Sequence, residues 1–361
     1  HCRNNTPRKK LTLRGVEEQV KILEDMGHKR LLLEFGEHPI QNPIDYVVDV
    51  IKTIYNTKSG KGEIRRVNVN IAATTVEDYR KLKVAGIGTY QLFQETYHRE
   101  TYDKMHKGPK ANYERQLFAH NRAFEAGIDD IGIGVLFGLY DWRFEVLALI
   151  SHAQYLDKKF GVGPHTISVP RWQPADTVIW EKAPHSVSEN ELLKIIAILR
   201  IAVPYTGMII STRENPETRA KAFEIGISQT SAASRTSPGG YGMEGKLSQF
   251  SLSDHRTLDE VLESILKQEL LPSFCTACYR LGRTGQDFMN FAKPGNIQNF
   301  CRPNAILTFK EYLEDYASEK VRKLGLKIID QYLEKIPNPN IITETKKRLY
   351  RIEQGERDIY F

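Results

Sequence analysis

Short apolar runs rich in β-branched residues alternate with longer amphipathic stretches over the first two-thirds of the chain. The short runs have the length of β-strands, and the longer stretches repeat apolar residues at helical spacing. Seven strands are predicted, at residues 30–35, 64–71, 89–93, 130–137, 165–169, 207–211 and 226–231. Seven helices are predicted among them, at residues 11–26, 44–55, 76–85, 113–126, 142–160, 189–201 and 216–224.

The ends of several predicted helices carry cap residues. Thr75, Asp141 and Ser188 stand where a side-chain oxygen accepts from the first backbone amides of a helix. Glycines follow many of the helices, where a left-handed residue closes the last turn. Strands that alternate with helices of this length imply right-handed crossovers and a parallel sheet.

The count of strands favours a closed (β/α)8 TIM barrel. A barrel needs eight strands and begins with one, whereas this chain begins with a predicted helix. We therefore expect the first strand and the loop after it to lie upstream of His1. The rival is a doubly wound open sheet, but no Gly-rich dinucleotide motif follows the first visible strand.

The pattern changes after Ser231. Residues 232–242 are small, polar and turn-prone, and residues 243–253 are predicted to be loop. Five helices then follow, at 258–270, 286–293, 308–317, 319–335 and 342–353, the last two separated by Pro337-Asn338-Pro339-Asn340. We predict a barrel domain at 1–254 and a mostly helical domain at 255–361.

Charge and hydropathy exclude several classes of protein. Among 361 residues, 51 Lys and Arg face 45 Asp and Glu, and no basic block stands out, so no nucleic-acid partner is expected. No apolar run approaches the roughly 20 residues that span a bilayer. Residues 1–5 lack the apolar core of a signal peptide, so a cytoplasmic protein is expected, with no membrane contact.

Three of the four cysteines lie close together in the sequence, namely Cys275, Cys278 and Cys301, while Cys2 stands alone. In a reducing compartment such clustering favours metal binding over disulfides. No histidine lies within the cluster. Three thiolates fit an iron–sulfur cubane with one unliganded iron, and they fit equally a zinc site that a distant side chain completes.

Several segments, taken together and in order, resemble one family. They are Cys275-Thr-Ala-Cys-Tyr-Arg-Leu-Gly-Arg-Thr-Gly-Gln-Asp-Phe-Met289, Cys301-Arg-Pro-Asn-Ala305, and residues 68–75, 94–98 and 163–171. They resemble the HydG family of radical SAM tyrosine lyases, which mature FeFe-hydrogenase. The resemblance implies a full (β/α)8 barrel with a C-terminal extension. It also implies S-adenosyl-L-methionine (SAM), an N-terminal 4Fe-4S cluster and a second 4Fe-4S cluster at the C-terminus.

The resemblance places SAM contacts after the strands. Gly36 and Glu37 resemble the family's GGE-type motif, which binds the methionine ammonium, and Glu95 is expected to face SAM. Gly134 and Gly138 resemble the family's motif on the adenine side of SAM. Arg143 is a candidate for binding the SAM carboxylate. On the residues alone, these positions also suit turns, packing and surface loops.

Other residues are assigned by resemblance to the substrate and to the second cluster. Arg213 and Ser231 are expected to hold the carboxylate of L-tyrosine, since a guanidinium offers paired donors; a surface pair of Arg213 with Glu214 is the alternative. Cys275, Cys278 and Cys301 are expected to hold the second cluster, and His165 a fifth iron attached to it. The chain departs from the family at Gln173, usually arginine, and at Ala232-Ala233, usually a glycine pair.

The implied reaction cleaves the Cα–Cβ bond of tyrosine to p-cresol and dehydroglycine. The second cluster would then convert the glycine fragment to CO and cyanide, with other hydrogenase maturases as partners. One alternative is the related 2-iminoacetate synthase of thiamine synthesis. The other is a non-catalytic metal-binding scaffold, because the sequence holds no CxxxCxxC motif, without which the polypeptide cannot cleave SAM.

Overall fold

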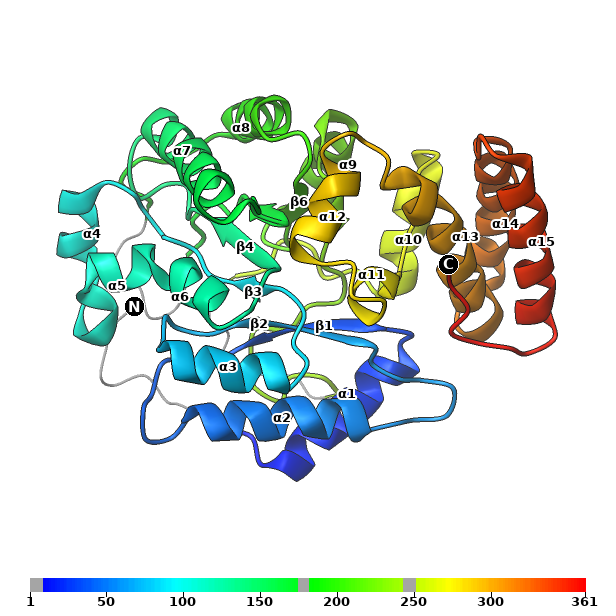
Figure 1. The fold of residues 1–361 in the computed structure, drawn as a ribbon, viewed down its shortest axis with the longest axis horizontal. Coiled ribbons are helices and arrows are strands. Elements are labelled where there is room, and N and C mark those ends of the chain that lie inside the picture. The colour runs from blue at the N-terminus through cyan, green and yellow to red at the C-terminus, as the bar shows by residue number, and fades with distance from the viewer. Residues whose placement is uncertain (1–8, 175–181, 243–250) are drawn as a thin grey trace.

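A computed structural model describes residues 9–174, 182–242 and 251–361 (Figure 1). Cys2 lies outside these residues. The seven strands form one sheet in the order of the sequence, and every pair of neighbours is parallel. They are β1 (Arg30–Glu34), β2 (Arg66–Asn70), β3 (Tyr90–Gln91), β4 (Ile131–Gly134), β5 (Thr166–Ser168), β6 (Gly207–Ile210) and β7 (Gln229–Thr230).

Helices connect and cover the strands, which confirms the predicted alternation. They are α1 (Leu13–Asp25), α2 (Ile44–Asn56), α3 (Val76–Val84), α4 (Arg99–Met105), the 3₁₀ turn η1 (Gly108–Ala111), α5 (Tyr113–Leu117), α6 (Ala119–Glu125), α7 (Trp142–Phe160), α8 (Glu189–Ala202) and α9 (Pro216–Ile225). Pairing of β1 with β7 is not found in the part of the chain described, so the sheet is curled but open. The fold is that of a (β/α) barrel with seven strands present and a helical C-terminal part.

Helix starts follow the predicted caps. Thr75 accepts from the amide of Asp78, and Asp141 from the amides of Arg143 and Phe144. Ser188 forms a full capping box with Glu191. These side chains fix where α3, α7 and α8 begin, and therefore where the preceding loops end.

Local predictions were wrong at three places. The helix predicted over 113–126 is divided at Phe118, whose ψ of 18° is not helical. Residues 99–111 form α4 and η1, which lack a long apolar periodicity. The helix predicted at 308 starts ten residues earlier and contains Pro303, which is buried there, so Cys301 lies in a helix.

The C-terminal helices gather on one side of the sheet (Figure 1). They are α10 (Leu258–Lys267), α11 (Ala277–Arg280), α12 (Gly285–Ala292), α13 (Gln298–Asp315), α14 (Glu319–Glu334) and α15 (Pro339–Glu353). A separate apolar core lies between them, with Leu262, Phe309 and Ile329 among its members. None of the helices within the described ranges has the length and apolarity needed to cross a membrane.

Two histidines are buried between α6, α7 and the sheet. His152 bonds the hydroxyl of Tyr97 at 2.7 Å, and its ring lies 5.9 Å from that of His120. Burial lowers the pKa of His120 to about 3 and that of His152 to about 4. An unfolded histidine titrates near ~6.5, so the unfolded chain binds protons first as the pH falls. The stability that each neutral histidine contributes is complete above ~6.5 and is lost as the pH falls toward 4.

We therefore expect His152→Gln to reduce the loss of unfolding free energy between pH 7 and pH 5 by about 2 kcal/mol. Urea unfolding at the two pH values measures this difference. His255→Gln, which makes the same change at an exposed histidine, is the control. A wild-type pH dependence in His152→Gln would contradict the assignment.

Candidate active site

Charged side chains meet at the end of the sheet where the strands finish. Glu37 follows β1, Glu95 follows β3 and Arg213 follows β6. Because the strands are parallel, their carboxyl ends share one face. Burial lowers the pKa of Arg213, and the carboxylates of Glu34, Glu95 and Glu214 act in the opposite direction. The guanidinium of Arg213 thus lies within electrostatic reach of carboxylates on three different strand ends.

Glu95 has an unusual backbone conformation and a lysine partner. Its φ is 69°, in the left-handed region that non-glycine residues rarely adopt. The amide of Leu136 donates to its carbonyl at 2.9 Å, and Lys110 donates to its carboxylate at 2.5 Å. Burial raises the pKa of Glu95, but Lys110 outweighs burial and holds the pKa below its usual range. Glu95 therefore carries a negative charge at the barrel mouth.

Glu145, from the first turn of α7, holds the segment after Glu95. Its carboxylate accepts from the Thr96 hydroxyl and, at 2.9 Å, from the Tyr97 amide. Glu145 is buried, and burial raises its pKa to about 7. The loop that presents Glu95 is thus fixed on both sides by hydrogen bonds from other elements.

Glu37 and Gly36 lie beside a second basic residue. Arg115 of α5 donates to the Glu37 carboxylate at 2.9 Å and also contacts the Ala73 carbonyl. The Gly36 carbonyl accepts from the Asn42 side chain, and a Cβ at Gly36 would meet nothing within 4 Å. This leaves open space next to Gly36 at the mouth.

The two other glycines assigned to SAM differ from Gly36. A Cβ at Gly134 would stand 2.7 Å from the Phe93 ring and 2.9 Å from the Ser168 carbonyl. Gly138 has a φ of 120°, which side chains rarely adopt, and lies against Trp172. Packing and backbone conformation therefore account for glycine at both positions.

Arg143 is not brought to this group of residues. Its side chain is 66% exposed, lies 3.9 Å from the Asp141 carboxylate, and stacks over the Trp142 ring at 4.4 Å. Its described contacts are therefore with its own helix start.

Glu214 forms a buried ion pair with Arg171, and its carboxylate also raises the pKa of Arg213, against the effect of burial. Gln173 donates to the Arg213 carbonyl at 3.4 Å.

The chain has Ala232-Ala233 where the family usually has two glycines. Ala233 is buried and has a φ of 52°. It keeps a left-handed conformation although it carries a Cβ.

A second polar group lies at the opposite end of the strands. His165 stands just before β5, and its Nδ1 lies 3.5 Å from the Asp130 carboxylate, just before β4. The Tyr279 hydroxyl of α11 lies 3.3 Å from Nε2 of His165, and Phe288 of α12 packs on the ring. Burial lowers the pKa of His165, so the imidazole is neutral at neutral pH.

Arg66 completes this end of the sheet. Its guanidinium lies 2.9 Å from the centroid of the Tyr279 ring and 4.0 Å from Asp130. Among the described residues, its Nε and Nη2 and both Asp130 oxygens have no hydrogen-bond partner although they are buried. Buried charged groups whose hydrogen bonds are unmet mark a site with free donors and acceptors.

The three cysteines lie close to this end. All are free thiols, with Cys275 before α11, Cys278 within it and Cys301 in the first turn of α13. Burial raises the pKa of Cys275 and of Cys301. Cys278 acts in the same direction at both thiols, and Arg283 acts in the opposite direction. Burial likewise raises the pKa of Cys278, against a hydrogen bond from Arg283. The Arg283 guanidinium therefore acts on the pKa of all three thiols.

Within residues 9–174, 182–242 and 251–361, no three His, Cys, Asp or Glu side chains converge on a position for a single ion. Cysteine thiolates bind both four-iron clusters and zinc, so the three cysteines suit either group. The cation Arg283 suits an anionic cluster. Cysteine ligands for a first cluster are not found in the sequence, where no CxxxCxxC motif occurs.

Comparison with known proteins places this arrangement in a family. Residues 1–149 match the radical SAM superfamily, and residues 168–271 match the biotin and thiamin synthesis associated domain. The crystal structure of HydG, a maturase of the [FeFe]-hydrogenase, is 60% identical with a TM-score of 0.96, over 99% of this chain and 79% of that one. This chain belongs to the HydG family of radical SAM enzymes.

Two further relatives agree. HydG from Carboxydothermus hydrogenoformans is 44% identical with a TM-score of 0.83, over 96% of this chain and 76% of that one. The 2-iminoacetate synthase of Salmonella typhimurium is 31% identical over 78% of this chain and 74% of its own length. The expected resemblance is confirmed, and the protein is a radical SAM enzyme.

The HydG-family site also contains residues that the sequence analysis did not single out. Lys110, Arg115, Asp130, Tyr279 and Arg283 each contact a predicted site residue. Lys110 and Arg115 lie in the short helical elements that were not predicted or were misplaced. Asp130 and Tyr279 reach His165 from distant parts of the sequence. Tyr279 and Arg283 both lie within the quoted cysteine segment, where the charge of Arg283 was a usable signal.

Substitution of the two glycines tests whether packing requires glycine at position 134 but not at position 36. Gly134→Ala should lower the free energy of unfolding by about 1–3 kcal/mol, because its Cβ overlaps Phe93 and the sheet backbone. Gly36→Ala should change it by less than about 0.5 kcal/mol, since the space there is open. Urea unfolding measures both. Equal losses in the two variants would show that packing does not distinguish them.

Proposed function

We propose that this enzyme cleaves the Cα–Cβ bond of L-tyrosine, giving p-cresol and dehydroglycine. The proposal is carried by the presence of two groups in one barrel. Arg213 and Glu95 lie at the carboxyl ends of the strands, and Cys275, Cys278 and Cys301 lie at the opposite end. Membership of the HydG family supports it, and so does the 2-iminoacetate synthase relative.

At the mouth, Arg213 binds the tyrosine carboxylate and Ser231 assists, because both follow adjacent strands β6 and β7. Glu95, kept ionised by Lys110, accepts from hydroxyl or ammonium groups of SAM, and Glu37 accepts from its methionine ammonium. SAM bound to a reduced cluster would supply the 5′-deoxyadenosyl radical that abstracts a hydrogen from the tyrosine amino group.

At the other end, Cys275, Cys278 and Cys301 would hold a second 4Fe-4S cluster. His165 would ligate a fifth iron, with Asp130 orienting its ring through Nδ1. Such a cluster would supply the chemistry that turns the glycine fragment into CO and cyanide, for assembly of the hydrogenase cofactor with other maturases. The proposal includes a cytoplasmic location and a division near residue 254, which falls between the core ending at Ile227 and the core beginning at Leu258.

Trapping of CO by haemoglobin during tyrosine turnover tests the proposal. Enzyme expressed from the whole natural gene and reconstituted anaerobically should release both p-cresol and CO. Cys301→Ser should still release p-cresol but lose CO, because the mouth is intact and the second cluster is not. Loss of both products in this variant would argue against separate sites.

The second candidate is a 2-iminoacetate synthase, favoured by the 31% identical relative. The gathered cysteine trio favours the first candidate. Tyrosine turnover that releases p-cresol without CO, in the wild-type enzyme with its clusters loaded, would establish the second.

Arg213 has its own test. Arg213→Lys keeps the positive charge but loses the planar fork, so KM for tyrosine should rise by about tenfold or more. KM for SAM should change little, which separates loss of substrate binding from general damage. Steady-state p-cresol formation measures both constants, and an unchanged KM for tyrosine would remove Arg213 from the substrate site.

A further inference from the structure

We propose that Arg219, paired with Asp254, is a positioning residue that sets the spacing of Arg213 and Ser231. The inference rests on the proposed function, in which these two residues hold the tyrosine carboxylate. Neither Arg219 nor Asp254 reaches the mouth itself. Both act from the outer side, where α9 and α10 face each other.

Arg219 fixes the end of β7. It extends from α9 and is only 2% exposed. Its Nη2 donates to the Ser231 carbonyl at 2.5 Å and also to the Thr230 hydroxyl. The position of Ser231 is therefore held by a guanidinium that belongs to a different element.

Asp254 fixes the end of β6. The amides of Ser253 and Asp254 both donate to the Thr212 carbonyl, at 2.9 and 3.1 Å. Thr212 is buried and directly precedes Arg213. The segment that carries Asp254 thus holds the backbone from which the Arg213 side chain projects.

One buried ion pair joins the two anchors. Nη1 of Arg219 contacts the Asp254 carboxylate, and the side chains are 2% and 1% exposed. Arg256 binds the same carboxylate at 2.6 and 2.9 Å. Although burial raises the pKa of Asp254, these two arginines hold it at about 2, so the pair stays charged.

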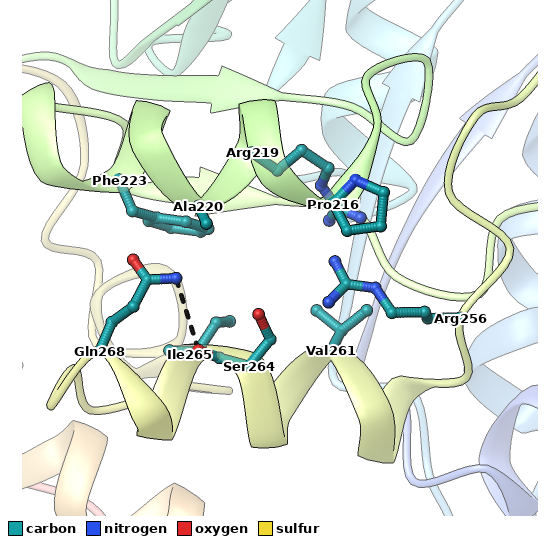
Figure 2. Close-up of a pocket in the computed structure, with 9 residues that line it drawn as sticks. All are labelled: Pro216, Arg219, Ala220, Phe223, Arg256, Val261, Ser264, Ile265 and Gln268. Atoms are coloured by element: carbon teal, nitrogen blue, oxygen red, sulfur yellow. Dashed lines mark hydrogen bonds between the residues drawn. The ribbon is translucent and has the colours of Figure 1, made fainter.

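Figure 2 shows Arg219 and Arg256 at the same end of the crevice between α9 and α10, with Gln268 at the other end. Because β6 and β7 are hydrogen-bonded neighbours, with Ile210 opposite Thr230, one guanidinium can bridge their ends. A lysine at 219 has a single ammonium and cannot bond Asp254 and Ser231 together in the planar fork of arginine. The spacing of Arg213 and Ser231 then depends on arginine at this position.

The test compares Arg219→Lys with the wild type in reconstituted enzyme expressed from the whole natural gene. KM for tyrosine should rise about tenfold while KM for SAM stays within the error of the wild-type value. Thr230→Val removes one acceptor of Arg219 with little change in volume, and should raise KM for tyrosine by a smaller factor. It keeps the test usable if Arg219→Lys does not fold.

Arg65→Lys is the matched control. Arg65 is another buried arginine, bound through two nitrogens to Glu311, but it lies at the opposite end of the barrel. It should lower the thermal midpoint as Arg219→Lys does, yet leave KM for tyrosine unchanged. A tyrosine KM that is unchanged in Arg219→Lys, or raised equally in Arg65→Lys, would overturn the positioning role. Absence of tyrosine cleavage in the wild type would instead refute the proposed function.

Discussion

Every strand of the sheet runs parallel to its neighbours, and this constraint divides the chemistry of the molecule between two ends. The carboxyl ends of the strands carry Glu95 and Arg213, while the amino ends carry Asp130 and His165. Antiparallel pairing would have mixed the two sets. If both ends act in one reaction, as proposed, a path from one end of the sheet to the other is implied.

Buried charge helps attach the C-terminal helices at the amino end. Arg65 binds Glu311 of α13 through two hydrogen bonds of 2.7 and 3.1 Å, and Lys29 lies 3.5 Å from the same carboxylate. Removing one partner of such a pair leaves an uncompensated charge and costs about 3–5 kcal/mol. The stacking of Tyr279 on Arg66 is a further contact between the C-terminal helices and the amino end of the sheet. Because Tyr279 follows Cys278 directly, the contact between Tyr279 and Arg66 also helps to position Cys278.

The sequence predicted the features that depend on near neighbours along the chain, and it did not predict contacts between residues far apart in the sequence. Strand and helix positions, and the caps at Asp141 and Ser188, depend on neighbours within a few residues, and they were predicted. The partner of Glu95 was not predicted, because Lys110 approaches it through the fold of a short 3₁₀ turn with no apolar period. The start of α13 was missed because Pro303 opposes a helix locally, although in the structure it is buried within α13. The roles of the residues came from resemblance and remain proposals.

Two non-glycine residues in left-handed conformations lie at the strand ends of the mouth, Glu95 after β3 and Ala233 after β7. Such a conformation costs roughly 1–2 kcal/mol and persists only where surrounding groups impose it. At Glu95 the surrounding groups are visible: Leu136 and Lys110 bind the residue, and Glu145 binds the next two. Their bonds come from three different elements, so the orientation of the carboxylate is set by packing across the barrel and not by the local sequence. The same reasoning applies to Ser231, two residues before Ala233, whose position is set by Arg219 from α9.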